Sequence, residues 1–541
     1  MHCSTTYLPY AATHAFSSLV TDYLAQVPAI TAFQLHAPTY EGISAAIETR
    51  KKYLVNRKLL VNALHKQYTG LSVSDQVANN IELLLAENTF TITTAHQPNI
   101  FTGPLYFIYK ILHTVKLCEE LKEKFPSENF VPIYYMGSED ADLEELGFIN
   151  AGDQHLIWET KQEGAVGRMK VDKPLLKILG DLERQIAVLP HGTAWITLLR
   201  NCYTEGKTIQ QATLELVNEL FGKYGVVVVI PDNAELKSLF RLTVEKELVE
   251  KFSESIVAET TLELAKHYKV QAAGRPINLF YLIDDKRERI EVEGERDKEE
   301  GIRYKVKGLG LSFTQEEILK ELYEHPERFS ANVILRGVFQ GTILTDIAFI
   351  GGGGELAYWL ELKNVFAAAG VPYPVLILRN SFVFIEPLVN ERIQKQHLSD
   401  NDLFETELTL INALVTKNTK QQLRLSEQIE QVKLQYQFIQ MLAAGVDKSL
   451  VEHAKSLEAR TVKLLAGLEK KIFRAEKRKY ETDIQQIQFI KKSLFPANSL
   501  QERHQNIALF YAKYGPGFID SIYKASTGLA QEFCVVKYIG K

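Results

Sequence analysis

The stretch FTITTAHQPN at residues 90–99 decides the fold. Its first half, Phe90 to Thr94, is a β-rich run, and its second half is a polar loop. Gly103-Pro104 follows where a helix can begin, because proline suits the first helical turn. Residues 105–125 then place apolar side chains at helical spacing, and residues 130–135 (FVPIYY) read as a second strand. This strand–helix–strand unit predicts two parallel strands joined by a right-handed crossover.

The alternation of strand and helix continues outward from this unit to about residue 385. Further strands are expected at residues 225–230, 333–335, 343–350 and 374–378, and a β-rich hairpin at residues 277–292. Helices are expected to begin at Thr314, where Glu317 completes a capping box, and to run from Glu355 to Ala369. The first 85 or so residues also read as helix. The pattern predicts an α/β fold built on a Rossmann-like, doubly wound parallel sheet.

A different pattern occupies residues 417–494, which contain no proline. Apolar residues recur there at steps of four and three, as in a heptad repeat. The series are Leu425, Ile429, Val432, Tyr436 and Ile439, and then Leu457, Thr461, Leu464 and Leu468. Residues 443–447 (AAGVD) suit a turn, so the segment predicts an antiparallel helical hairpin that helps the chain to form a homodimer. We interpret its lysines as a solvated helix face rather than a nucleic-acid patch, because aromatic residues do not alternate with them.

These patterns divide the chain into segments. They are an N-terminal helical part of the core (residues 1–88), the first half of the Rossmann-like core (89–146), an insertion (147–222), the second half of the core with a β-rich insertion near 275–310 (223–385), an antiparallel coiled-coil hairpin (386–495) and a C-terminal segment that returns to the core (496–541). A chain of 541 residues is long enough for about three or four domains of ordinary size.

Composition excludes several classes of protein. Hydrophobic residues make up 46% and charged residues 24% of the chain, so extensive disorder is excluded. The net charge of −5 argues against a nucleic-acid partner. Apolar runs are far shorter than the roughly 20 residues that span a bilayer, and no secretory signal is visible, so no membrane partner is expected. Cys3, Cys118, Cys202 and Cys534 form no close pair along the chain, which favours a reducing, cytoplasmic location.

The polar loop after the first strand is the first candidate site. It holds His96, Gln97 and Asn99, and it is followed by Thr102 and Gly103 at the start of the next helix. Ligands of open α/β sheets bind at the carboxyl ends of the strands, and the positive end of a helix there favours an anion. We therefore expect these residues to bind a ligand; the alternative is a polar loop that only caps the helix.

A cluster of carboxylates follows the second predicted strand, in the run SEDADLEE at residues 138–145. Repulsion among these groups can raise the pKa of one carboxyl, which could then act as a general base. Alternatively, the cluster can hold an ammonium group or a divalent ion. Glu139 and Asp140 are the candidates for this chemistry. Glu144 and Glu145 instead suit the first turn of a helix, where acidic residues are stabilising.

The third candidate is the glycine loop at Gly351 to Gly354, which is followed by Glu355 and Tyr358. From Gly352 it fits the G-x-G-x-x-A dinucleotide fingerprint, but the acidic residue expected about 20 positions later is missing. We interpret the loop as one that approaches a carboxylate or another anion. Arg336 and Arg379, each predicted to end a strand nearby, can bind such a group or form structural ion pairs.

Several of these motifs resemble the bacillithiol biosynthesis cysteine-adding enzymes, the BshC family. The matching residues are TTAHQ at 93–97, TGPLY at 102–106, Tyr109-Lys110, Val131-Pro132, SED at 138–140, Asn332-Val333, Leu335-Arg336, GGGELAY at 352–358, LFP at 494–496 and LQER at 500–503. Two positions depart from the family pattern, because Ala141 stands where a histidine is usual and Gly353 where a proline is usual. No lysine loop of the KMSKS type is visible in the chain.

The resemblance implies a core like that of class I aminoacyl-tRNA synthetases and nucleotidyltransferases, with connecting-peptide insertions and a coiled coil that makes a homodimer. It also implies a ligase that joins the carboxyl of cysteine to the glucosamine amine of glucosaminyl-malate, in the last step of bacillithiol formation. His96 and Gln97 would then stabilise an oxyanion, and Glu139 or Asp140 would bind an ammonium or deprotonate the amine. Amide formation needs an activated carboxyl, whose source the sequence does not show: ATP and another carboxyl activator both stay open. No metal site is predicted.

Two other functions stay open at this point. The first is an NADP-dependent oxidoreductase that uses the glycine loop at residues 351–357, with Arg379 as the partner of the 2′-phosphate. The second is a non-enzymatic scaffold built on the coiled-coil hairpin.

Overall fold

Five parallel strands form the central sheet of the chain. The computed structural model describes residues 1–293 and 302–540 and divides into two units, Met1–Ile385 with Ser499–Lys541, and Glu386–Asn498. The sheet order is β14-β13-β2-β3-β6, with bounds β14 Val375–Leu378, β13 Asp346–Gly351, β2 Thr89–His96, β3 Asn129–Met136 and β6 Val227–Val229. The chain enters the sheet at β2 and extends it first toward β6 and later toward β14, which confirms the predicted doubly wound arrangement.

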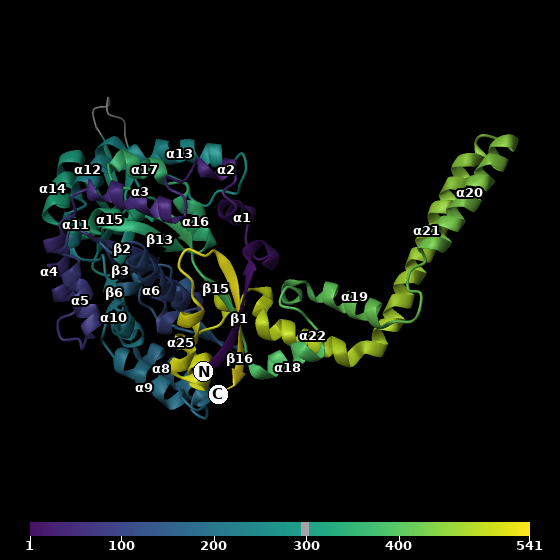
Figure 1. Ribbon diagram of the computed structural model, residues 1–541. Coiled ribbons are helices and arrows are strands. Elements are labelled where there is room, and N and C mark those ends of the chain that lie inside the picture. Colours follow the sequence, from purple (N-terminus) through teal and green to yellow (C-terminus); the bar gives the residue numbers. More distant parts are fainter. Residues whose placement is uncertain (294–301, 541) are drawn as a thin grey trace. The chain divides into compact units, whose positions relative to one another are not determined.

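Helices cover both faces of this sheet (Figure 1). Helix α6 (Tyr106–Lys124) joins β2 to β3 as predicted, and its Leu117 and Leu121 pack with Ile92 of β2 and Ile47 of α3 (Tyr40–Lys51). On the other face, the ring of Phe349 in β13 stacks on Trp359, with 4.2 Å between the ring centroids. Burial on both faces explains why these strands are nearly continuous apolar runs rather than alternating ones.

Two predictions for the second half of the core are wrong. Residues 333–335 were expected to form a strand, but they begin helix α15 (Val333–Ile343), which starts where the Asn332 side chain accepts a hydrogen bond from the Ile334 backbone. A short apolar run does not distinguish a strand from a buried helix, and the cap at Asn332 decides between them. The helix expected over residues 355–369 is split into α16 (Gly353–Trp359) and α17 (Lys363–Ala369).

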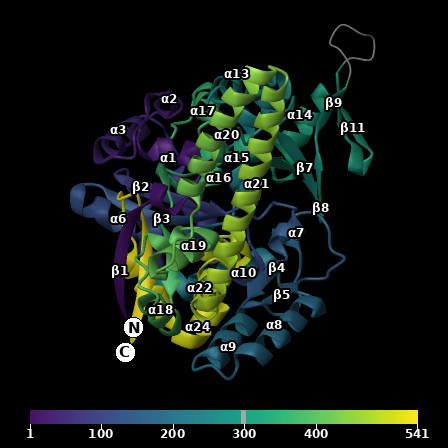
Figure 2. The same cartoon turned by 90° about the vertical axis from the view of Figure 1, so that its right-hand side faces the viewer.

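The N-terminus also differs from the prediction. Residues expected to be helical form strand β1 (His2–Pro9), which pairs antiparallel with β16 (Glu532–Gly540). Strand β16 in turn pairs in parallel with β15 (Ser381–Ile385), so the two ends of the chain lie side by side (Figures 1 and 2). The helices that follow are α1 Ser18–Leu24, α2 Pro28–Thr31, α3, α4 Arg57–Gln67 and α5 Asp75–Leu83. The partner strand lies at the far end of the sequence, so local pattern could not reveal this pairing.

Two long connections interrupt the sheet. Between β3 and β6 lie α7 Leu143–Leu146, β4 Phe148–Ala151, β5 Gln154–Ile157, α8 Lys173–Ile186, α9 Gly192–Cys202 and α10 Ile209–Phe221. Between β6 and α15 lie α11 Ala234–Ser238, α12 Arg241–Glu250, α13 Phe252–Leu264, β7 Leu279–Ile283, β8 Lys286–Arg289, β9 Glu291–Glu293, β10 Arg303–Val306, β11 Leu311–Thr314, α14 Gln315–Glu324 and β12 Phe329–Ala331. The capping box at Thr314 and Glu317 is confirmed, whereas residues 294–301 of the predicted β-rich insertion lie outside the described residues.

The second unit is helical. Its helices are α18 Pro387–Lys395, α19 Glu407–Asn418, α20 Ser426–Val446, α21 Leu450–Lys477 and α22 Glu481–Leu494. Helices α20 and α21 lie side by side, joined by Tyr436 and Thr461 hydroxyls 2.9 Å apart and by a hydrogen bond from Gln440 to Glu458 (Figure 2). The hairpin is confirmed, but the predicted turn at residues 443–447 is largely helical, and the chain reverses at Asp447–Ser449. Among the described helices, none combines the length and apolar composition needed to cross a membrane.

The chain returns to the larger unit through α23 Gln501–His504, α24 Ala508–Tyr514 and α25 Pro516–Ala525. Helix α23 is fixed to β15 by side chains: Gln501 accepts a hydrogen bond from the Phe384 backbone at 2.9 Å, and Glu502 accepts one from the Phe382 backbone at 3.0 Å. This attachment holds residues 501–504 beside the end of β14.

His113 of α6 predicts a pH dependence of stability. Its ring is fully buried, accepts a hydrogen bond from the Asn380 backbone at 3.0 Å and donates one to the Gly528 carbonyl at 2.7 Å, and burial lowers its pKa to about 4. In the unfolded chain this histidine binds a proton near pH 6.5, whereas in the folded chain it does so only near pH 4. The contribution of the neutral ring to the free energy of unfolding is therefore complete above pH 6.5 and is lost as the pH falls toward about 4. From about pH 7.5 to about pH 5 the parent should lose about 2 kcal/mol of unfolding free energy through this residue.

The measurement is urea denaturation of the parent and of His113→Gln at both pH values. Because glutamine does not titrate in this range, the variant should lose less stability on acidification than the parent. An equal loss in both proteins would show that His113 is not the group responsible.

Candidate functional site

A cavity of about 520 Å³ lies at the carboxyl ends of β2, β3 and β13. Its lining residues are Ala95, His96, Gln97, Tyr106, Lys110, Tyr135, Gly137, Ser138, Glu139, Asp140, Glu145, Pro231, Arg287, Ala331, Asn332, Val333, Arg336, Phe339, Gly352, Gly353, Gly354, Glu355, Tyr358, Arg379 and Arg503. All belong to the larger unit. The structure therefore brings together the three predicted loops, because parallel strands end at the same edge of the sheet.

His96, the last residue of β2, is held in the wall of this cavity. Only 9% of its surface is exposed, and its ring packs against Tyr106 and Phe107, with ring centroids 5.2 and 5.6 Å away. Burial, together with the nearby cations Lys110, Arg379 and Arg336, holds the pKa of His96 well below its usual value. Its Nε2 atom is buried and has no hydrogen-bond partner among the described residues. A neutral imidazole whose Nε2 atom has no partner can form a hydrogen bond with a ligand.

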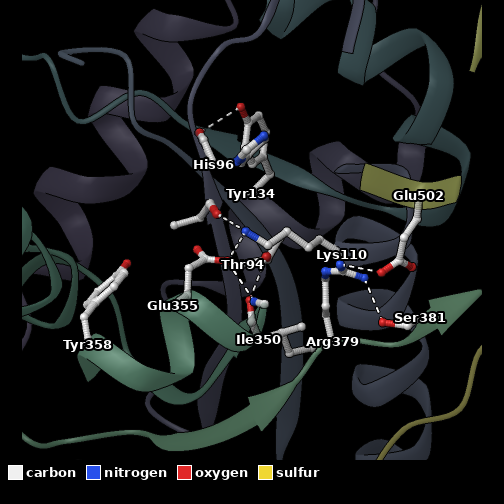
Figure 3. A network of polar contacts seen from close by, with 12 residues as sticks. Thr94, His96, Lys110, Tyr134, Ile350, Glu355, Tyr358, Arg379, Ser381 and Glu502 are labelled. Atoms are coloured by element: carbon white, nitrogen blue, oxygen red, sulfur yellow. Dashed lines mark hydrogen bonds and ion pairs between the residues drawn. The ribbon is translucent and has the colours of Figure 1, made fainter. Parts of the chain in front are cut away.

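Lys110 of α6 was not among the predicted site residues, yet it lies at the centre of the polar network (Figure 3). Its ammonium donates to the Ala95 carbonyl at 2.8 Å and forms an ion pair with Glu355. The side chain is 2% exposed. A lysine within the apolar stripe of residues 105–125 was the signal that could have identified it, because a charged side chain is rarely buried without a partner.

The glycine loop carries Glu355 to this network. The Glu355 carboxylate accepts a hydrogen bond from the Gly352 backbone at 2.8 Å. None of Gly351 to Gly354 has a positive φ, but a Cβ at Gly351 would lie 2.8 Å from the Phe349 ring, whereas one at Gly354 would meet nothing within 4 Å. The loop therefore leaves room for a ligand at Gly354. The Gly352 N–H already donates to the Glu355 carboxylate, and this negative charge would repel a pyrophosphate. The loop therefore argues against a dinucleotide ligand.

The two predicted arginines differ in their availability. Arg379 follows β14 as expected, but it is buried and paired with Glu502 at 2.7 Å, and it donates to the Ser381 hydroxyl at 3.0 Å. Arg336 does not end a strand, because residue 333 begins α15, and its Nη2 donates to the Tyr358 hydroxyl at 2.5 Å. Its Nη1 is buried without a partner among the described residues. Arg336 is therefore the arginine with a free donor for a ligand.

The acidic cluster is also divided. Glu139 forms an ion pair with the buried Lys237. Asp140 lines the cavity, and its carboxylate accepts a hydrogen bond from the Gln97 amide at 3.0 Å and one from the Asp142 backbone at 3.3 Å. Glu145, expected only to start a helix, lines the cavity as well, and burial raises its pKa. The N-terminus of helix α7 is instead capped by Asp142, whose side chain accepts a hydrogen bond from the Glu145 backbone N–H.

Three predicted residues, Asn99, Thr102 and Gly103, do not line the cavity. The Asn506 amide holds the turn that contains them, because it donates hydrogen bonds to the Phe101 and Gly103 carbonyls at 2.9 and 2.6 Å. Gly103 has φ +61°, and a Cβ there would lie 2.7 Å from the Asn99 side chain. The structure therefore places these residues in the connection between β2 and α6, where Asn99 Oδ1 and Thr102 Oγ1 are buried without a hydrogen-bond partner among the described residues.

Two arginines complete the cavity from distant parts of the chain. Arg287 comes from β8, and its guanidinium lies 3.7 Å from the centre of the Phe280 ring, while Arg503 comes from α23. Neither was predicted, because spacing along the sequence does not show which insertion folds back over the sheet. The cavity thus presents both cations and carboxylates, and it can bind a small ligand that carries both charges.

Comparison with known proteins identifies the family. The family model for the bacillithiol biosynthesis BshC N-terminal Rossmann-like domain matches residues 1–380, and the model for the BshC C-terminal coiled-coil domain matches residues 382–538. A Flavobacterium johnsoniae protein named "Putative cysteine ligase BshC" is 38% identical over 531 residues, covering 98% of this chain and 99% of that protein. A Cytophaga hutchinsonii protein of the same name is 38% identical over 496 residues, covering 92% of each chain.

Among solved structures, a Campylobacter jejuni protein described as a putative arginyl-tRNA synthetase is 10% identical, with a TM-score of 0.22, and the match covers 84% of this chain and 99% of that chain. The two family models together extend over both structural units, and the relatives match from end to end. The chain therefore belongs to the BshC family of bacillithiol biosynthesis.

Proposed function

We propose that the chain is a cysteine ligase of bacillithiol biosynthesis that joins the carboxyl of L-cysteine to the glucosamine amine of glucosaminyl-malate. Its family and the names of its relatives support the ligase role. The observation that carries the proposal is the cavity itself, which is lined both by His96 and Arg336, each with a buried nitrogen that has no partner among the described residues, and by the carboxylates of Asp140 and Glu145.

The charges of the proposed substrates match these groups. Glucosaminyl-malate carries carboxylates and an amine, and cysteine carries a carboxylate and an ammonium. Arg336 Nη1 and His96 Nε2 are suited to bind a carboxylate, since a buried donor without a partner costs about 1–3 kcal/mol that a ligand can recover. Asp140 and Glu145 are suited to bind the ammonium or amine.

The proposed reaction is attack of the glucosamine nitrogen on an activated cysteine carboxyl. The C–N bond forms, the activating group leaves and the nitrogen loses a proton. His96 and Gln97 would stabilise the oxyanion, and Asp140 would orient the amine or accept its proton. Because Glu139 is already paired with Lys237, Asp140 is the stronger candidate for the base. Activation requires a co-substrate, for which we propose ATP or another carboxyl activator.

Thiol analysis by mass spectrometry tests this function. A bacterium that makes bacillithiol but lacks its own gene of this family should accumulate glucosaminyl-malate and contain no bacillithiol. Expression of the present chain should restore bacillithiol and consume the glucosaminyl-malate. Persistence of glucosaminyl-malate despite stable expression would contradict the proposal. Tight binding of NADPH in a fluorescence titration would instead favour the oxidoreductase.

We also propose that the hairpin forms the contact of a homodimer. Ile429, Val432 and Tyr436 are partly buried, and the Tyr436 hydroxyl lies 2.9 Å from the Thr461 hydroxyl of α21. Apolar side chains on the outer face of α20 stay exposed: Leu434 is 62%, Phe438 55%, Met441 65% and Leu442 58% accessible. A stripe of large exposed apolar residues is typical of an interface with another chain. The four cysteines, all unpaired, suit the proposed cytoplasmic location.

A further inference from the structure

We propose that Lys110 is a positioning residue of this site: its ammonium clamps the end of β2, which carries His96, to the glycine loop that follows β13. This inference rests on the proposed function, because the ligand used to test it is the proposed substrate.

The contacts of Lys110 reach both segments at once. Its Nζ donates to the Ala95 carbonyl, one residue before His96, at 2.8 Å. The same Nζ is ion-paired with Glu355, whose carboxylate also holds the Gly352 amide. Figure 3 shows Lys110 reaching from α6 between the two segments, with His96 on one side and Glu355 on the other. One ammonium therefore sets the spacing between the imidazole and the open glycine loop.

A second side-chain link between the two segments is a hydrogen bond from the Thr94 hydroxyl to the Ile350 carbonyl at 2.8 Å. That bond joins the last recorded pair of β2 and β13, whereas Lys110 acts beyond that pair, at Ala95 and Glu355. Strand pairing between β2 and β13 is recorded up to Thr94 and Ile350. Beyond that point β2 stays paired with β3 up to His96, and β13 with β14 up to Gly351, so Lys110 links two strand ends that no longer pair with each other.

Stability alone does not account for a lysine here. A buried ion pair is often no more stabilising than apolar residues of similar volume, because both charges lose their hydration. Lys110 is buried in α6, one helical turn from Phe107 and Thr114, where a methionine would pack without that cost. The pair is explained if its role is to hold two parts of the site in register, since a displacement of about 1 Å can cost 100-fold in rate.

The test uses calorimetric titration of the full-length protein with glucosaminyl-malate. The variants are Lys110→Met, Glu355→Gln, the Lys110→Met/Glu355→Gln double variant and Lys110→Arg, each with its melting temperature. Lys110→Met alone leaves Glu355 without its cation and can fail to fold, so the double variant, which has no unpaired charge, is the decisive one.

The double variant is expected to melt close to the parent and to bind glucosaminyl-malate at least about tenfold more weakly. Lys110→Arg, which can still reach a carbonyl and a carboxylate, should keep an affinity within about threefold of the parent. Parental affinity in the double variant would overturn the clamp, as would a Lys110→Arg variant that melts normally but binds as weakly as the double variant. If the parent itself does not bind glucosaminyl-malate, the proposed function fails instead.

Discussion

Replacing Asp140 with asparagine is expected to slow bacillithiol formation roughly 100-fold, the lower end of the usual effect of losing a general base. Asp140 lies at the carboxyl end of the sheet, lines the cavity and is oriented by the Gln97 amide at 3.0 Å. Asparagine keeps the shape but cannot hold an ammonium or accept its proton. The rate is measured from glucosaminyl-malate and cysteine in extracts of a strain without its own enzyme, because such extracts supply the activator.

Glu144→Gln is the matched control for this change. Glu144 is exposed on α7, four residues from Asp140, and it does not line the cavity. Its loss should cost no more than a few tenths of a kcal/mol of helix-end electrostatics and should leave the rate unchanged. Both variants should melt close to the parent. Equal rates for Asp140→Asn and the parent would show that the cluster only starts a helix.

The second large effect is expected at the hairpin. Changing Phe438 and Leu442 together to aspartate places two charges on the exposed apolar face of α20. Burying them in a dimer contact should cost about 4 kcal/mol or more, which raises the dissociation constant roughly 1,000-fold. Sedimentation velocity should then show a dimer for the parent and a monomer for the variant.

A control variant that adds two aspartates elsewhere on the second unit shows whether added charge alone dissociates the dimer. Thr482 and Gln485 are exposed on α22, outside the hairpin of α20 and α21. The Thr482→Asp/Gln485→Asp variant should therefore remain dimeric. A dimer in both double variants would place the contact elsewhere, and a monomeric parent would remove the dimer altogether.

The fold was predictable where each step is local. The β2–α6–β3 unit follows from two apolar runs and one helical stripe, and its parallel pairing follows from the length of the crossover. Strand β1 was missed because its partner, β16, lies at the opposite end of the chain. The strand expected at residues 333–335 was wrong because three apolar residues fit a buried helix equally well, and the hydrogen bond at Asn332 is visible only in the structure.

The site was predictable to the same extent. His96 ends one strand, and Asp140 and Gly354 lie within four residues of the ends of two others in the same parallel sheet, so topology alone brings them together. Arg287 and Arg503 come from an insertion and from the C-terminal return, and no pattern in the sequence relates either segment to the sheet edge. The roles within the acidic cluster were also hidden, because the partner that neutralises Glu139 is Lys237, far away in sequence.

Direct binding of glucosaminyl-malate to the cavity is the most direct measurement, since it requires no knowledge of the activator. Calorimetric titration should show binding to the parent and to Arg184→Met, which removes an arginine that is 75% exposed on α8. Arg336→Met removes the buried Nη1 donor and should weaken binding about 10- to 100-fold, the range for a lost charge-assisted hydrogen bond. Binding of equal strength by the parent and Arg336→Met, or no binding by the parent, would contradict the assignment of this cavity as the ligase site.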